Sequence, residues 1–132
     1  GGNTFKSMIR DLSLDYPDFL IASSEWFAFI PAKEYFDEPG DHADELETSV
    51  MMHYHPELVN LDEAGDGNYK KFASQMLNEK VAWIPRNWQN VSQDTGIGNP
   101  KKASAGKGKK YAEAVVAKYA LLFEELVHKE LY

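Results

Sequence analysis

Hydrophobic residues recur at helical spacing near both ends of the chain. In residues 4–15, Phe5, Met8 and Leu12 fall on one face, a pattern typical of an amphipathic helix. A longer stretch, from about residue 104 to the C-terminus, repeats this spacing. Its apolar positions are Ala112, Val115, Val116, Tyr119, Leu122, Phe123, Leu126 and Val127. Both stretches predict helices that bury a broad face.

The middle of the chain predicts further helices and two strands. Asp41 can cap a helix over residues 42–54, and a shorter helix is expected around residues 69–77. Residues 19–23 and 81–84 are short, continuous apolar runs, which we interpret as buried strands. Helix, turn and buried strand in succession indicate an α/β fold. A sheet of only two such strands would have uncovered edges. The sequence therefore predicts half of an α/β domain.

Composition narrows the class of protein. The 132 residues are 43% hydrophobic and 27% charged, which argues against a disordered chain. The net charge of −7 argues against nucleic acid as a partner, because phosphate binding needs concentrated Lys and Arg. The absence of cysteine excludes disulfides and thiolate metal sites. With no apolar run of membrane-spanning length and no signal peptide, we expect a soluble, cytoplasmic protein that binds no membrane.

The segment around His42 is the best candidate for chemistry. His42 precedes Glu45 and Glu47 in a predicted first helical turn, and Glu47 can converge with His42 if the histidine lies at the cap, just outside the helix. A histidine beside a carboxylate can transfer protons near neutral pH, or the pair can offer ligands to a divalent metal. From spacing alone, a helix cap with dipole-favoured acidic residues is the simpler interpretation.

Two tryptophans lie in segments without a helical or strand pattern. Trp26 and Trp88 could form an aromatic wall around a small planar ligand, and Trp26 is the better candidate. Packing in the protein interior is the alternative. No phosphate-binding loop, dinucleotide fingerprint or serine-hydrolase elbow is present.

Three segments, in order along the chain, resemble the creatininase family of amidohydrolases. Residues 1–6 (GGNTFK) are similar to the end of its His-Gly-Gly-Asn motif and the following helix. Residues 42–49 (HADELETS) are similar to its His-Ala-Gly-Glu-x-Glu-Thr-Ser signature, with Asp44 replacing the usual glycine. Residues 95–108 resemble the segment that leads into its final helix. Gly2 stands where creatinine-specific members have a metal-binding glutamate, which makes creatinine a doubtful substrate.

The resemblance implies a three-layer α/β/α sandwich of the creatininase type, with residues 1–132 as the C-terminal portion of a single domain. The N-terminal half, which carries most of the family's metal ligands, would then be missing from this chain. A partner supplying that half is therefore expected, as is a homo-oligomer, a hexamer in several family members. We expect the fragment to be inactive alone.

The resemblance also implies the reaction and its residues. The family hydrolyses non-peptide C–N bonds in small amides, cyclic ones included, with water activated by two metals, often zinc or manganese. His42 would be the proton shuttle. Glu47 would orient His42 or reach the metal, Glu45 is a further candidate ligand, and Trp26 is a candidate substrate contact. The alternative is a non-catalytic α/β module or assembly subunit.

Overall fold

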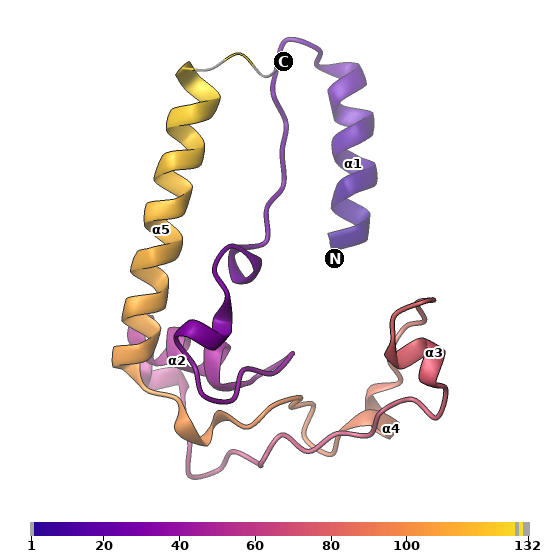
Figure 1. The fold of residues 1–132 in the computed structure, drawn as a ribbon, viewed down its shortest axis with the longest axis vertical. Helices are drawn as coiled ribbons and strands as arrows, with labels where there is room; N and C mark the ends of the chain where they lie inside the picture. The colour runs from indigo at the N-terminus through magenta and orange to yellow at the C-terminus, as the bar shows by residue number, and fades with distance from the viewer. Residues whose placement is uncertain (1, 129, 131–132) are drawn as a thin grey trace.

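The structure, a computed structural model, describes residues 2–128 and 130. Five α-helices are present in these residues, together with short 3-10 turns between them (Figure 1). The α-helices are α1 (Gly2–Asp15), α2 (Glu45–Tyr54), α3 (Gln75–Asn78), α4 (Trp88–Val91) and α5 (Ala105–His128). The 3-10 turns are η1 (Trp26–Ala28), η2 (Ala32–Glu34), η3 (Pro56–Leu58) and η4 (Pro100–Lys102).

The densest packing lies where α2 meets the N-terminal half of α5. The buried side chains there are Phe36, Leu46, Tyr111 and Val115. The two helices approach closely at Gly108, where an added Cβ would lie 1.9 Å from the carbonyl oxygen of Ser49. We call this region the junction; it comprises α2, residues 36–44 and 97–104, and α5 as far as Val115.

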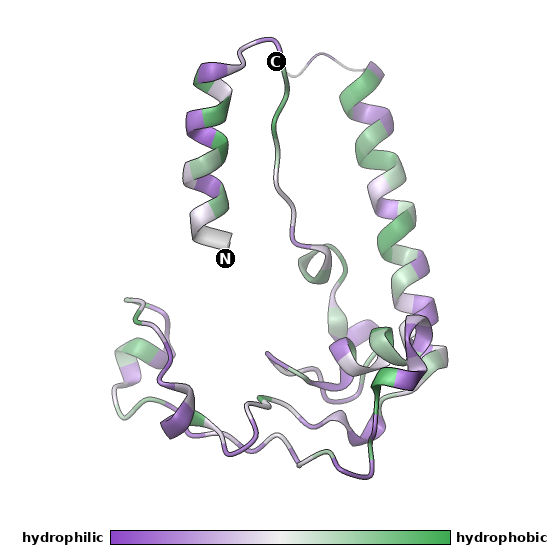
Figure 2. Cartoon of the chain, turned by 180° about the vertical axis from the view of Figure 1, so that it is seen from behind, coloured by the Kyte–Doolittle hydropathy of each residue, from purple (hydrophilic) through white to green (hydrophobic). Residues whose placement is uncertain are grey.

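The rest of the chain extends from the junction in separate arms (Figure 1). One arm, the upper arm, is α1 with the extended segment of residues 16–25, and this segment runs between α1 and α5 in Figure 1. The other, the lower arm, comprises residues 69–91 and carries α3 and α4. Large apolar side chains are exposed on both, including Phe19 at 70% and Trp83 at 75%. Figure 2 shows hydrophobic residues along α5 and along the extended segment.

The predicted α/β/α sandwich is wrong for this structure. No strand or sheet forms among the described residues, whose bridges are the isolated pairs His42–Ile97 and Tyr69–Ser92. Residues 19–23 and 81–84, predicted as buried strands, are extended or irregular, with most of their side chains exposed. A strand needs a neighbour to pair its backbone groups, and neither run has one among residues 2–128 and 130.

Each predicted helix has a counterpart in the structure, although the bounds of two of them differ. Residues 4–15 and the long C-terminal helix are confirmed by α1 and α5, although residues 129, 131 and 132 lie outside the described part. The helix predicted over 42–54 begins later, at Glu45, because Asp44 rather than Asp41 is its N-cap. The helix expected at 69–77 is confined to α3, which starts after Ser74. No helix in the described residues has the length and apolarity to cross a bilayer.

Candidate functional site

The first turn of α2 is organised by two carboxylates. Asp44 accepts hydrogen bonds from the N–H groups of Glu47 at 2.9 Å and of Gly40 at 2.5 Å. Glu47 reaches back with Oε2 to accept from the N–H of Ala43 at 2.6 Å. Capping by Asp44 and Glu47 satisfies amide groups that a helix start leaves unpaired. Ala43 has a φ of 49°, which turns the chain sharply into the helix.

His42 lies just outside this helix and beside Glu47. Its backbone forms the bridge with Ile97, donating at 3.1 Å and accepting at 2.8 Å. Its Nδ1 lies 3.5 Å from Oε2 of Glu47. The side chains are 47% and 38% exposed, respectively. The structure therefore brings together two of the residues singled out in the sequence, in a position that is open to solvent.

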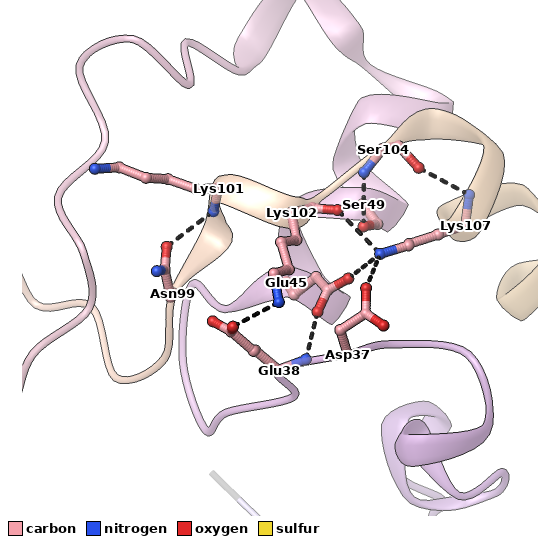
Figure 3. A network of polar contacts seen from close by, with 9 residues as sticks. All are labelled: Asp37, Glu38, Glu45, Ser49, Asn99, Lys101, Lys102, Ser104 and Lys107. Atoms are coloured by element: carbon pink, nitrogen blue, oxygen red, sulfur yellow. Dashed lines mark hydrogen bonds and ion pairs between the residues drawn. The ribbon is translucent and has the colours of Figure 1, made fainter.

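Glu45 occupies a different environment, in a polar network inside the junction (Figure 3). It is fully buried, and both of its carboxylate oxygens have partners. Oε2 accepts from the N–H of Glu38 at 2.6 Å, and Oε1 pairs with the ammonium group of Lys107. Lys107 also binds Asp37 at 2.7 Å. A buried carboxylate needs such partners, because leaving it unpaired would cost several kcal/mol (order of magnitude).

The contacts in this network stabilise the charged forms of Asp37 and Lys107. The hydrogen bond from Lys107 lowers the pKa of Asp37, and its positive charge adds to the effect. The hydrogen bonds to Asp37 and Glu45 raise the pKa of Lys107. Close by, the N–H of Ser104 donates to the buried hydroxyl of Ser49 at 3.1 Å. These contacts fix the start of α2 against the start of α5.

A cavity of about 560 Å³ opens beside the start of α2. Trp26 and Glu47 both line it, so the structure places the predicted aromatic contact on the same cavity as the predicted carboxylate. Trp26 packs edge-on against Tyr111, with ring centroids 6.1 Å apart. Glu63 and Asp94 add acidic side chains, and no basic side chain is among the described residues that line it. An electron-poor or cationic group suits such a cavity.

The side chains present do not complete a metal site. In the described part of the chain, no group of three or more His, Cys, Asp or Glu residues is arranged to hold an ion. His42 and Glu47 offer one nitrogen and one carboxylate. Zinc takes four ligands, at least three of them from protein in catalytic sites, so this pair alone does not fit the requirement.

Sequence reasoning gave too little weight to residues that come from distant segments. Arg86 pairs with Asp41, and the ring of Trp88 lies 5.3 Å from that of His42. Lys107, which no motif marks in the sequence, neutralises the buried Glu45. No local pattern marks such pairs: Arg86 and Asp41 lie 45 positions apart, and Lys107 and Glu45 lie 62 apart.

Comparison with known proteins identifies the family. The sequence profile of the family Creatininase, described as creatinine amidohydrolase, matches residues 1–123. The chain is also similar to a crystal structure from Bacteroides fragilis NCTC 9343 named "Putative creatinine amidohydrolase", with 60% identity and a TM-score of 0.92. That match covers 100% of this chain and 53% of the Bacteroides chain. No curated protein matches. The profile match extends over most of the chain, and the chain therefore belongs to the creatininase family.

Proposed function

We propose that this chain carries the proton-transfer part of an amidohydrolase that cleaves a non-peptide C–N bond of a small amide. The observation that carries the proposal is the pairing of His42 Nδ1 with the Glu47 carboxylate at 3.5 Å, in an exposed position. Family membership supports amide hydrolysis as the reaction class. The neighbouring cavity offers space for a small substrate.

The proposed chemistry follows from the two ring nitrogens of His42. Glu47 faces Nδ1 and favours the tautomer that carries a proton there. Nε2 is then free to take a proton from the attacking water and, as imidazolium, to deliver it to the leaving nitrogen. The negative charge of Glu47 stabilises the imidazolium, as the orienting carboxylate does in hydrolase triads. Trp26 would form a wall of the substrate cavity.

A divalent metal, zinc or manganese, belongs to the proposal as a cofactor because the family is generally metal-dependent. The described residues of this sequence do not complete its site, so the remaining ligands would come from outside these residues. Glu47 is better placed than Glu45 to act as a ligand, since it is accessible from the cavity, whereas Lys107 and the N–H of Glu38 occupy both oxygens of Glu45.

The proposed partner of these residues is a segment equivalent to the part of the Bacteroides chain that this sequence does not match. Two facts support it: the match covers 53% of that chain, and large apolar side chains on α1 and α5 are exposed, among them Phe5 at 55% and Phe123 at 60%. Exposed apolar area of this kind marks surfaces that bind protein. The chain alone would then be inactive, and a homo-hexamer of the complete enzyme remains part of the proposal.

The test is to co-express the chain with that unmatched part of the Bacteroides protein, a pair we call the reconstituted enzyme. Hydrolysis of a panel of small linear and cyclic amides is measured with zinc or manganese added. His42→Ala should lower kcat by about 10²- to 10⁴-fold, the usual contribution of a general acid–base residue.

His55→Ala is the matched control, because His55 also pairs with a glutamate, Glu57 at 3.1 Å, but lies at the other end of α2. The rival function is a non-catalytic module or assembly subunit. Full turnover by His42→Ala, or no turnover on any amide by a folded reconstituted enzyme, would favour that rival.

A further inference from the structure

His42 combines a fixed backbone with an exposed side chain. Both of its backbone groups bond to Ile97, which is itself buried at 3% exposure. The imidazole is 47% exposed. A group that transfers a proton must hold a defined orientation toward the reacting atom, since small misplacements are costly. The contacts that fix the ring therefore bear directly on the proposed reaction.

Glu47 by itself holds the imidazole loosely. The distance of 3.5 Å between Nδ1 and Oε2 is long for a hydrogen bond. The same Oε2 accepts from the N–H of Ala43 at 2.6 Å, so the carboxylate is anchored more firmly to the backbone than to His42. A second contact is needed to restrict rotation of the ring.

Trp88, the first residue of α4, makes that second contact. Its ring centroid lies 5.3 Å from that of His42, at an interplanar angle of 57°. The guanidinium carbon of Arg86 lies 5.4 Å from the Trp88 ring centroid, and the guanidinium group pairs with the carboxylate of Asp41. Arg86 and Trp88 thus contact two consecutive residues, Asp41 and His42, of the distant segment.

We propose that Trp88 is a positioning residue for His42 and that the ion pair between Arg86 and Asp41 holds the indole in place. The indole packs against the imidazole and limits it to the orientation in which Nδ1 faces Glu47. Nε2 is then the nitrogen presented to the substrate. This role rests on the proposed function, because ring orientation matters for turnover only if His42 transfers a proton.

A spectroscopic experiment tests the contact without any turnover. An indole ring shifts the NMR signals of protons packed against it through its π electrons. In the reconstituted enzyme, Trp88→Leu should move the ring-proton signals of His42 toward those of free histidine. Trp83→Leu is the control, since Trp83 belongs to the same arm but is 75% exposed. Unmoved His42 signals in the folded Trp88→Leu variant would overturn the proposal.

Kinetics test whether the contact serves the reaction. Trp88→Leu should lower kcat roughly 10-fold with little change in KM, a part of the about 100-fold that misplacement of a catalytic group can cost. Trp88→Phe keeps an aromatic face on His42 and should restore most of kcat. A purely structural role would instead reduce the amount of folded enzyme without changing kcat per folded molecule.

The two proposals fail in different ways. If His42→Ala abolishes turnover while Trp88→Leu retains the wild-type kcat, the positioning role is refuted and the proposed function stands. If His42→Ala retains full turnover, the proposed function is refuted, and the positioning role falls with it whatever the NMR signals show.

Discussion

The junction and the arms of this chain contain similar residues but differ in how far they bury them. In the junction, Leu46 is 5% exposed and the charged Glu45 is fully buried, with a partner for each carboxylate oxygen. On the upper arm, apolar side chains such as Phe5, at 55% exposure, face outward. Local sequence does not distinguish the two regions, because both contain amphipathic helices.

This difference in burial indicates that contacts within the chain stabilise the junction more than the arms. The junction brings together two distant stretches of the sequence, residues 36–54 and 97–115, and satisfies its buried polar side chains within the described residues. The arms extend away from it (Figure 1) and bury little of their apolar area. Since burial of apolar area is the dominant favourable contribution to folding, the junction should respond strongly to substitution and the arms weakly.

The largest expected effect comes from removing apolar volume. Leu46→Ala should lower the free energy of unfolding by about 2–5 kcal/mol, the usual cost of such a change in a core. Phe5→Ala, on exposed α1, should change it by less than about 0.5 kcal/mol. Urea unfolding followed by circular dichroism measures both. Equal losses in the two variants would remove the distinction between junction and arm.

The second effect concerns the close approach of α2 and α5. Gly108→Ala places a Cβ about where the backbone carbonyl of Ser49 lies, so the helices must separate, at a typical cost of about 1–3 kcal/mol. Gly106, two positions earlier on α5, has no atom within 4 Å of an added Cβ. Gly106→Ala should leave stability unchanged or raise it by up to about 1 kcal/mol. Thermal unfolding of both variants decides the matter, and equal stability would contradict the close packing.

Helices were predicted well because their signal is local. The spacing of Phe5, Met8 and Leu12 is visible within a few turns, and α1 forms there. The strands predicted at 19–23 and 81–84 do not form, and the sequence could not show this, since a continuous apolar run has no period that separates a strand from an exposed extended segment. Whether such a run becomes a strand depends on pairing with a neighbouring strand, and no neighbour is present for either run among the described residues.

The candidate site likewise contains local contacts, which the sequence could predict, and long-range contacts, which it could not. Glu47 and His42 lie close together in sequence, and a histidine just outside the helix was enough to predict that they could converge, as they do at 3.5 Å. The contacts of Glu45 with Lys107, and of His42 with Trp88, depend on the path of the chain between them. Such long-range pairs have no spacing rule, so they could be found only from the structure.

A third prediction compares two ion pairs of α5 lysines: Lys107 with Glu45 of α2, and Lys109 with Glu113 of α5 itself. Glu45→Gln keeps an acceptor for the N–H of Glu38 but removes the negative charge facing Lys107. The free energy of unfolding should fall by about 1–3 kcal/mol, the range for a hydrogen bond to a charged group. Glu113→Gln breaks an exposed pair with Lys109 at 3.8 Å, worth no more than about 0.5 kcal/mol. Chemical denaturation at neutral pH measures the free energy of unfolding of both variants. An unchanged free energy of unfolding in Glu45→Gln would show that the junction does not need this charge.

The smallest expected effect is the acid sensitivity of the junction. The hydrogen bond from Lys107 lowers the pKa of Asp37 below its ordinary value of 3.8. A lowered pKa in the folded state means that the ionised carboxylate stabilises the fold at neutral pH, and that this contribution is lost as the pH falls below about 3.8, through the folded-state pKa. Because the Asp37 side chain is 61% exposed, solvent screens the pair and the change should be small. Asp37→Asn should therefore lose slightly less stability than the wild type between pH 5 and about pH 2. Denaturation at a series of pH values measures both profiles, and an Asp37→Asn profile as steep as that of the wild type would place the acid-sensitive contact outside the pair of Asp37 and Lys107.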